Sequence, residues 1–162
     1  MPHESDFAKA HSSFLRQAFA LARQALTQGD RPFGALMAVQ GNIVLQATNT
    51  VISRNDPTAH AEMNLLRRAG REIPGETLAR ATLYTSTEPC LMCAGAIVQM
   101  RVNHVVYGCR AECIPDRPRE HPTLSGRTIL LASDPPIRVE GPCLEQEALN
   151  IHLESRWWLA GV

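Results

Sequence analysis

The chain has 162 residues, of which 44% are hydrophobic and 20% are charged, a composition typical of a globular domain of ordinary size. It contains no run of about 18 apolar residues, which argues against a membrane-spanning helix. Sixteen basic residues balance sixteen acidic ones, so no overall positive field would attract nucleic acid or an anionic membrane.

The first part of the chain predicts a long helix followed by a hairpin. Apolar side chains recur at helical spacing over residues 7–28, and Gly29 ends this pattern. The apolar runs in "RPFGALMAV" and "IVLQATN" are separated by Gly41 and Asn42, a pair of residues typical of a tight turn. We therefore expect two strands that form a hairpin.

In the middle of the chain, two predicted helices flank a strand. Asp56 is the expected cap of a helix over residues 57–69, with Pro57 in its first position and Gly70 at its end. "RATLYTS" is rich in β-branched and aromatic residues and predicts a strand. Pro89 opens a second helix, "CLMCAGAIVQMR", whose small and apolar face indicates close packing on a sheet.

The last third of the chain alternates less regularly. "VNHVVYG" predicts a strand, and residues 109–127 form a Pro-rich, charged segment long enough for a functional loop. At least one of "RTILLAS" and "IRVEG" is expected to be a strand, and a final helix is expected over about residues 142–158. Strands that alternate with helices predict a layered α/β structure with a partly parallel sheet, in a single domain over residues 1–162.

Three residues carry the side chains that a zinc ion selects, and all three lie at the starts of predicted helices. Cys90 and Cys93 are three residues apart, so their sulfurs can point to one side of a helix about one turn apart. The positive end of that helix favours thiolates. His60 lies in the first turn of its own predicted helix, so the three ligands converge if both helices start at the same edge of the sheet.

The number of ligands separates a catalytic zinc site from a structural one. Closed structural sites use four protein ligands, whereas three ligands leave a position for water, whose pKa zinc lowers to about 7. Glu62, two residues beyond His60, points away from it on a helix and is the candidate proton carrier. We therefore predict one Zn²⁺ per chain, held by His60, Cys90 and Cys93, with Glu62 as the catalytic residue.

Two other interpretations of these residues remain open at this point. A "C-x-x-C" pair also occurs in thiol redox proteins, although such a protein leaves His60 and Glu62 without a role. A zinc-stabilised binding protein without enzymatic activity needs a fourth protein ligand, for which Cys109 and Cys113 are the candidates.

The segments "NDPTAHAEM", "TLYTSTEPCLMCAGAI" and "RVNHVVYG" resemble the cytidine and deoxycytidylate deaminase superfamily, in the branch of bacterial tRNA adenosine deaminases and guanine deaminases. The resemblance extends from about residue 7 to residue 107, with a weaker match over the last helix. It implies a three-layer α/β/α sandwich around a five-stranded mixed sheet. It also places His60, Cys90 and Cys93 on the zinc ligands of the family and Glu62 on its proton shuttle.

The resemblance further implies a reaction and three substrate-binding residues. In hydrolytic deamination, the Glu62 carboxylate takes a proton from the attacking water and passes protons to the ring nitrogen and the leaving ammonia. Asn49 falls on an asparagine that hydrogen-bonds the base, Ala61 would offer backbone contacts, and Phe33 would line the pocket. From the residues alone, Asn49 is equally a turn residue at a strand end, and Phe33 a core residue.

The charge pattern favours a free nucleobase or nucleoside over a polynucleotide as substrate. Residues 128–162 contain two arginines against five acidic residues, a net charge of −3, whereas a protein that grips tRNA is expected to carry a basic surface. The alternative is a tRNA-specific adenosine deaminase, which converts adenosine to inosine by the same chemistry. The sequence does not decide which base is deaminated.

The remaining features give expectations of partner, location and side-chain role. The odd number of cysteines, five, and the polar N-terminal residues argue against a disulfide framework and favour the cytoplasm. The resemblance implies a homodimer. Trp157 and Trp158 would either cover the site or pack the last helix. Cys109 and Cys113 are interpreted as buried or loop thiols, rather than as ligands that join His104 or His121 around a second metal, and Cys143 is assigned no role.

Overall fold

The computed structural model describes residues 4–115 and 124–160 of the chain. Five strands form one mixed sheet in the order β2-β1-β3-β4-β5. β1 pairs antiparallel with β2 and β3, whereas β3, β4 and β5 run parallel to one another. The strands are β1 (Gly34–Val39), β2 (Asn42–Thr48), β3 (Thr82–Thr87), β4 (His104–Cys109) and β5 (Arg138–Glu140).

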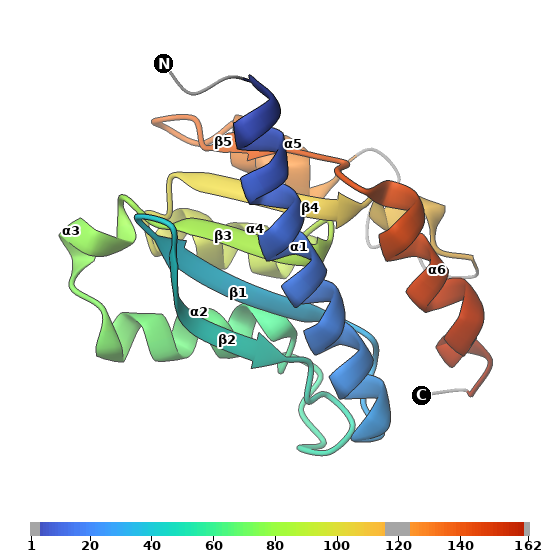
Figure 1. Cartoon of the computed structure of the whole chain (residues 1–162). Coiled ribbons are helices and arrows are strands. Elements are labelled where there is room, and N and C mark those ends of the chain that lie inside the picture. Colours follow the sequence, from blue (N-terminus) through green and yellow to red (C-terminus); the bar gives the residue numbers. More distant parts are fainter. Residues whose placement is uncertain (1–3, 116–123, 161–162) are drawn as a thin grey trace.

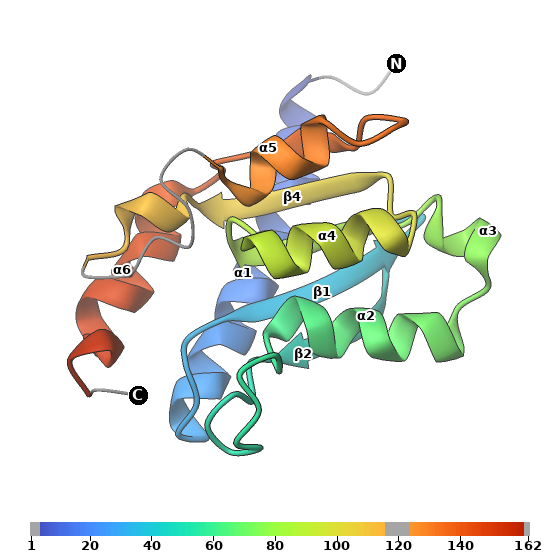
Figure 2. The same ribbon diagram turned by 180° about the vertical axis from the view of Figure 1, so that it is seen from behind.

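Helices cover both faces of this sheet, so the predicted three-layer α/β/α sandwich is confirmed. The helices α1 (Glu4–Thr27) and α6 (Glu145–Ser155) lie on one face, seen from the front in Figure 1. The helices α2 (Ala61–Glu72), α4 (Leu91–Gln99) and α5 (Gly126–Leu131) lie on the other face, which Figure 2 shows. Three short helices complete the described chain: α3 (Gly75–Leu78), η1 (Ala111–Cys113) and η2 (Trp157–Ala160).

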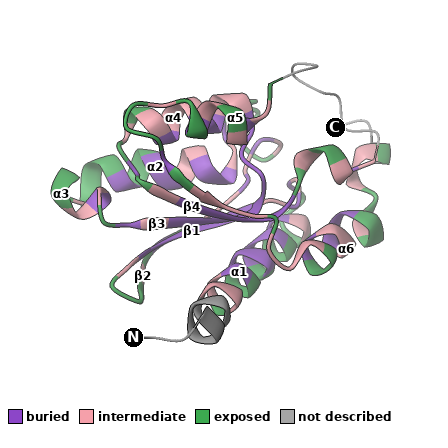
Figure 3. Ribbon diagram, turned by 90° about the horizontal axis from the view of Figure 1, so that it is seen from above, coloured by how far each residue is buried: buried purple, intermediate pink, exposed green. Residues whose placement is uncertain are grey.

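Each face of the sheet has its own hydrophobic core, because successive residues of a strand point to opposite faces. In β3, Leu83 packs beneath α2 and α4, whereas Tyr84 packs beneath α1. Figure 3 shows that the central strands β1, β3 and β4 are mostly buried between the two helix layers, whereas the edge strand β2 is largely exposed or half-buried. Full burial of a side chain such as Leu65 or Phe19 contributes about 1.5–3 kcal/mol, so both layers are held to the sheet by apolar contact.

The hairpin and the first helix are confirmed, with a small shift of the turn. The two turn residues are Gln40 and Gly41, both with positive φ (50° and 80°), and Asn42 already belongs to β2. A two-residue turn with both φ values positive matches the twist of the strands it joins, which explains the tight connection.

The predicted start of the 57–69 helix is wrong. The Asp56 carboxylate accepts hydrogen bonds from the Thr58 amide and hydroxyl, which closes a local turn instead of capping a helix. The helix α2 begins only at Ala61 and continues through Gly70 to Glu72. A glycine in this position weakens the helix, but it does not end it here.

Of the two segments for which at least one strand was expected, "IRVEG" supplies β5 and "RTILLAS" forms the helix α5. The start of α5 is capped by the hydroxyl of Ser125, which accepts a hydrogen bond from the amide of Thr128. The packing of Leu130 into the core beside α4 outweighs the strand preference of the β-branched residues. The last helix, α6, begins at Glu145, three residues later than expected from Pro142. None of the described helices is both long and apolar enough to cross a bilayer.

Candidate functional site

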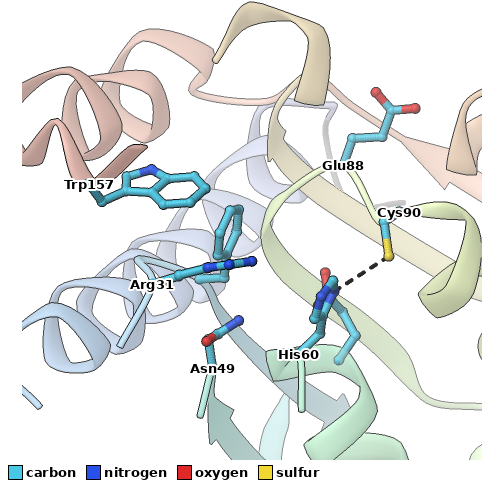
Figure 4. A pocket seen from close by; sticks show the side chains of 8 residues that line it. Arg31, Asn49, His60, Glu88, Cys90 and Trp157 are labelled. Atoms are coloured by element: carbon cyan, nitrogen blue, oxygen red, sulfur yellow. Dashed lines mark hydrogen bonds between the residues drawn. The ribbon is translucent and has the colours of Figure 1, made fainter. Parts of the chain in front are cut away.

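The three predicted zinc ligands come together between the starts of two helices. His60 is the N-cap residue of α2, and Cys90 is the N-cap residue of α4. Both have extended backbone conformations, so His60 lies just outside its helix and not within the first turn as expected. Cys93 follows inside the first turn of α4, where its amide donates to the Cys90 sulfur at 3.5 Å. Figure 4 shows His60 and Cys90 facing each other across the gap between the two helices.

The separations of the three side chains suit a tetrahedral zinc ion. His60 Nδ1 lies 3.5 Å from the Cys90 sulfur and 3.6 Å from the Cys93 sulfur. Zn–S bonds of about 2.3 Å and Zn–N bonds of about 2.0–2.1 Å, at a tetrahedral angle, place sulfur and nitrogen about 3.5–3.6 Å apart. The donor atoms therefore stand where ligands of one zinc ion would stand, and both atom types are ones that zinc prefers.

The protonation of the two thiols also fits a cation. Hydrogen bonding from the Cys93 thiol, helped by His60 and the Cys93 amide, lowers the pKa of Cys90 to about 4. The neighbouring Cys90 sulfur and burial raise the pKa of Cys93, because a second thiolate would be crowded against the first. A divalent cation between the sulfurs would offset that repulsion and allow both to bind as thiolates.

A buried carboxylate stands beside the ligands. Glu62, the second residue of α2, is only 5% exposed. Its Oε1 accepts a hydrogen bond from the Thr85 hydroxyl at 2.8 Å, and its Oε2 lies 3.7 Å from the Cys93 sulfur. Burial, reinforced by the charge of Cys90, raises the pKa of Glu62. A carboxyl group with a raised pKa can both accept and return a proton near neutral pH.

The thiols considered as a fourth ligand lie elsewhere. Cys109 is buried 3.6 Å from the Thr87 hydroxyl, and Cys113 lies 3.6 Å from a carboxylate oxygen of Glu145. Within the described residues, His60, Cys90 and Cys93 form a group of three to which no further His, Cys, Asp or Glu side chain belongs. A closed four-ligand site is therefore not what these residues form. Of the two histidines considered beside these thiols, His121 lies outside the described residues.

A pocket adjoins the three ligands and encloses about 390 Å³, including its open mouth. Its position beside the ligands is visible in Figure 4. The residues that line it are Arg31, Phe33, Asn49, His60, Glu62, Glu88, Cys90 and Trp157.

Two of the three expected substrate-binding residues lie on the strand side of this pocket. Asn49 is 1% exposed, and its Oδ1 accepts a hydrogen bond from the Val51 amide at 3.0 Å. The carbonyl group of its side chain is thus held in place, and its NH₂ group is the part that could meet a ligand. Phe33, just before β1, lines the pocket as expected, whereas Ala61 is fully buried and its side chain is not part of the lining.

The sequence interpretation missed Arg31 and Glu88 and left Trp157 undecided. The guanidinium carbon of Arg31 lies 5.7 Å from the ring centre of Trp157. Trp157 lines the pocket and is also tied to the last helix, because its indole N–H donates to Nδ1 of His152 on α6 at 3.0 Å. Glu88 accepts a hydrogen bond from the amide of Arg127 and so joins the pocket to α5. Glu88 directly precedes Pro89 and Cys90 in the sequence, and this position next to a predicted ligand could have indicated that it lies at the site.

Close packing fixes the segment that leads into α4. A methyl group added at Gly126 would overlap the carbonyl oxygen of Pro89, the residue before Cys90. The start of α5 therefore rests directly on the backbone that presents the first sulfur, and only glycine leaves room for this contact.

Comparisons with known proteins agree with this geometry. Residues 8–109 match the family model of the cytidine and deoxycytidylate deaminase zinc-binding region. The tRNA-specific adenosine deaminase of Buchnera aphidicola (subsp. Schizaphis graminum) is 39% identical over 66% of this chain and 71% of its own length. The probable cytosine deaminase of Schizosaccharomyces pombe is 32% identical over 91% of this chain and 93% of its own. The solved structure of the Bacillus subtilis guanine deaminase superposes with a TM-score of 0.59 at 36% identity, and covers 71% of this chain and 82% of that chain.

Proposed function

The chain belongs to the cytidine and deoxycytidylate deaminase family of zinc-dependent hydrolases, and on this premise we propose that it deaminates a free purine or pyrimidine base or nucleoside and releases ammonia. The observation that carries the proposal is the group of three metal-binding side chains with a buried carboxylate beside it, at the wall of a small pocket. A structural metal site needs neither the carboxylate nor the pocket.

His60, Cys90 and Cys93 would hold one zinc ion per chain, which fits their separations of 3.5 and 3.6 Å. When bound at three protein ligands, zinc supplies a water molecule whose pKa is lowered to about 7.

Glu62 would move the protons of the reaction. Its Oε1 is anchored by the Thr85 hydroxyl, so its Oε2 is the oxygen that can exchange a proton. The carboxylate would take a proton from the attacking water and give it to the ring nitrogen while the water oxygen bonds to the carbon that bears the amino group. It would then move the proton of the added hydroxyl group to the amino nitrogen, so that the carbon–nitrogen bond breaks, ammonia leaves and a carbonyl group remains. Burial keeps this side chain away from bulk solvent, so a proton it holds is retained for the substrate.

The pocket would hold the ring of the substrate beside the ligands. The aromatic rings of Phe33 and Trp157 meet edge to face at 5.5 Å and give the pocket an apolar wall. The NH₂ group of Asn49 and the guanidinium of Arg31 offer donors to ring nitrogens or carbonyl oxygens, and Glu88 offers an acceptor. The backbone amide of Ala61 belongs to the first turn of α2, whose amides have no partner within the helix, so it would add a further donor.

A base or nucleoside fits the charge of this region better than a polynucleotide. The segment that reaches the pocket through Trp157 belongs to residues 128–162, whose net charge is −3, and phosphate groups would be repelled there. The second candidate is adenosine deamination in tRNA, which is favoured by the 39% identity to the Buchnera tRNA-specific adenosine deaminase.

Ammonia release tests both candidates directly. The zinc-loaded protein would be incubated with guanine, adenine, cytosine and their nucleosides, and in parallel with tRNA at low salt, where phosphate contacts are strongest. Turnover of at least one base or nucleoside is expected. Turnover of tRNA alone would replace the first candidate by the second, and no turnover of any of these substrates by the zinc-loaded protein would contradict both.

Three further statements belong to this proposal. We propose that residues 1–162 act as one deaminase domain, that the protein works as a homodimer, and that it acts in the cytoplasm, where free thiols such as Cys109 and Cys113 stay reduced. Light scattering of the purified chain would test the homodimer.

A further inference from the structure

A second group of metal-binding side chains lies away from the pocket, on the face of the sheet that α1 covers. It consists of His11 on α1, His104 at the start of β4 and Glu140 at the end of β5. His104 pairs in register with Thr82 at the start of β3, whereas Cys90 follows the end of that strand. The group and the pocket are therefore separated by the length of β3, roughly 17 Å at 3.3 Å per residue.

The three side chains converge on one point. His104 Nε2 lies 2.8 Å from Oε1 of Glu140, and His11 Nε2 lies 3.7 Å from Oε2 of the same carboxylate. Two ligands bound to one zinc ion at about 2.0–2.1 Å and a tetrahedral angle stand about 3.3 Å apart. The two observed separations involve different oxygens of the Glu140 carboxylate, and each lies within about half an ångström of that value. Small side-chain shifts would therefore bring both nitrogens and the carboxylate to one cation.

Both imidazole rings are held in the orientation that a ligand needs. Nδ1 of His11 is hydrogen-bonded to the Tyr84 hydroxyl at 2.8 Å, and Nδ1 of His104 to the Thr82 hydroxyl at 2.9 Å. In protein metal sites, the nitrogen of histidine that does not bind metal is almost always engaged by an oxygen in this way, which fixes the ring and its tautomer. The two hydroxyl groups come from alternate residues of β3 and thus from one face of the sheet.

The exposure of the three side chains and the position of the nearest positive charge are both compatible with a bound cation. The side chains of His11, His104 and Glu140 are 14%, 18% and 30% exposed, so the group is mostly buried but a cation could still reach it from solvent. The positive charge of Arg138 would compete with a cation for Glu140, because its guanidinium contacts Oε1 of that carboxylate at 2.7 Å. The Arg138 side chain is 64% exposed, however, and can move into solvent.

We propose that His11, His104 and Glu140 form a second metal site, which takes a divalent cation of the zinc class and ties α1 to β4 and β5. A histidine pair with one carboxylate is a ligand set that zinc accepts, and it contains no sulfur. The site is independent of the proposed deamination, because none of its residues lines the pocket. Its ligands come from residues 11, 104 and 140, so a bound ion would link distant parts of the chain.

Metal content tests this proposal on the full chain, prepared without a histidine tag. The protein would be equilibrated with Zn²⁺, passed through a desalting column and analysed for zinc per chain. Two equivalents are expected in the wild type, and one in His11→Gln and in Glu140→Gln. Glu147→Gln is the matched control, because Glu147 pairs with Arg16 in the same layer but has no imidazole beside it. This control should keep both equivalents.

Cobalt substitution identifies which site is lost. Co²⁺ bound through the two cysteine sulfurs has an intense sulfur-to-cobalt absorption, whereas Co²⁺ at a nitrogen and oxygen site has only weak bands. Cys90→Ser should lose the intense band and the first equivalent, and keep the second. Tyr84→Phe, which removes one hydroxyl, should weaken the second equivalent by about 10–100-fold, and Arg138→Gln, which removes a competing cation, should tighten it.

One equivalent of zinc in the folded wild-type protein would overturn the proposal, as would two equivalents in both His11→Gln and Glu140→Gln. Circular dichroism verifies that the variants are folded. The wild-type count decides the question even if a variant fails to fold. A deaminase assay on His11→Gln should show unchanged activity, which separates this result from any failure of the proposed function.

Discussion

Replacement of Glu62 by alanine tests the proposed reaction most directly. Proton transfer by a positioned carboxylate contributes about 10²–10⁴ in rate, which corresponds to about 2.7–5.4 kcal/mol in the activation free energy. Because Glu62 is only 5% exposed, buffer bases cannot easily replace it, and the loss in kcat should fall in the upper part of that range. Zinc content should stay at the wild-type value, since Glu62 does not belong to the group of three ligands. The assay is ammonia release with the best substrate, with zinc measured in the same samples.

Two variants make this experiment specific. Glu62→Gln keeps the shape of the side chain and can still accept the Thr85 hydrogen bond, so a similar loss of kcat would assign the effect to the proton and not to packing. Glu88→Gln changes another buried carboxyl group of the same pocket, and it should affect KM more than kcat. The reasoning is refuted if Glu62→Ala, with full zinc content, keeps more than about a tenth of the wild-type kcat.

Three further predictions concern the surroundings of the site. Thr85→Val removes a hydrogen bond that favours ionised Glu62, so the pKa of Glu62 rises and the acidic limb of the kcat/KM profile moves to higher pH. An unmoved limb would argue against Glu62 as the base. Gly126→Ala pushes a methyl group against Pro89 and should weaken zinc about 10-fold or more, as measured by competition with a chelating dye. Leu65→Ala should lower the urea unfolding free energy of the zinc-loaded protein by about 2–5 kcal/mol, and a loss below about 1 kcal/mol would contradict the assigned core.

The convergence of His60, Cys90 and Cys93 could be predicted because local signals and topology agree. "H-A-E" and "P-C-x-x-C" each stand at the start of a helix that follows a turn or strand end, and helices on one face of an α/β sheet that start at the same edge bring such residues together. The sequence did not show that His60 and Cys90 are N-cap residues. Asp56 carries the stronger local cap signal, and only the turn that it forms with Thr58 moves the helix start to Ala61.

The parts that were missed depend on contacts between distant residues. The helix α5 contradicts the strand preference of Thr128 and Ile129, and its position is set by the packing of Leu130 in the core. The pocket residues Arg31 and Trp157 meet only because residues more than a hundred positions apart are folded against each other. No spacing or periodicity in the sequence carries information of this kind.

The positions of His60, Cys90 and Cys93 on the two helices explain how the fold would build the proposed metal site and keep one side of it open to the pocket. An N-cap residue has an extended backbone, as at His60 (φ −65°, ψ 155°) and Cys90 (φ −71°, ψ 172°). The Cys90 sulfur caps its own helix by accepting a hydrogen bond from the Cys93 amide, and it also lies 3.5 Å from Nδ1 of His60 at the start of the other helix. Cys93 adds a third direction from within α4. Glu62, the second residue of α2, approaches the same group from another side, because its Oε2 lies 3.7 Å from the Cys93 sulfur. Two helix starts thus place the three proposed ligands and the proposed proton carrier together, and His60, Cys90 and Glu62 line one pocket, so a substrate bound there would meet the proposed metal site and the carboxylate at the same time.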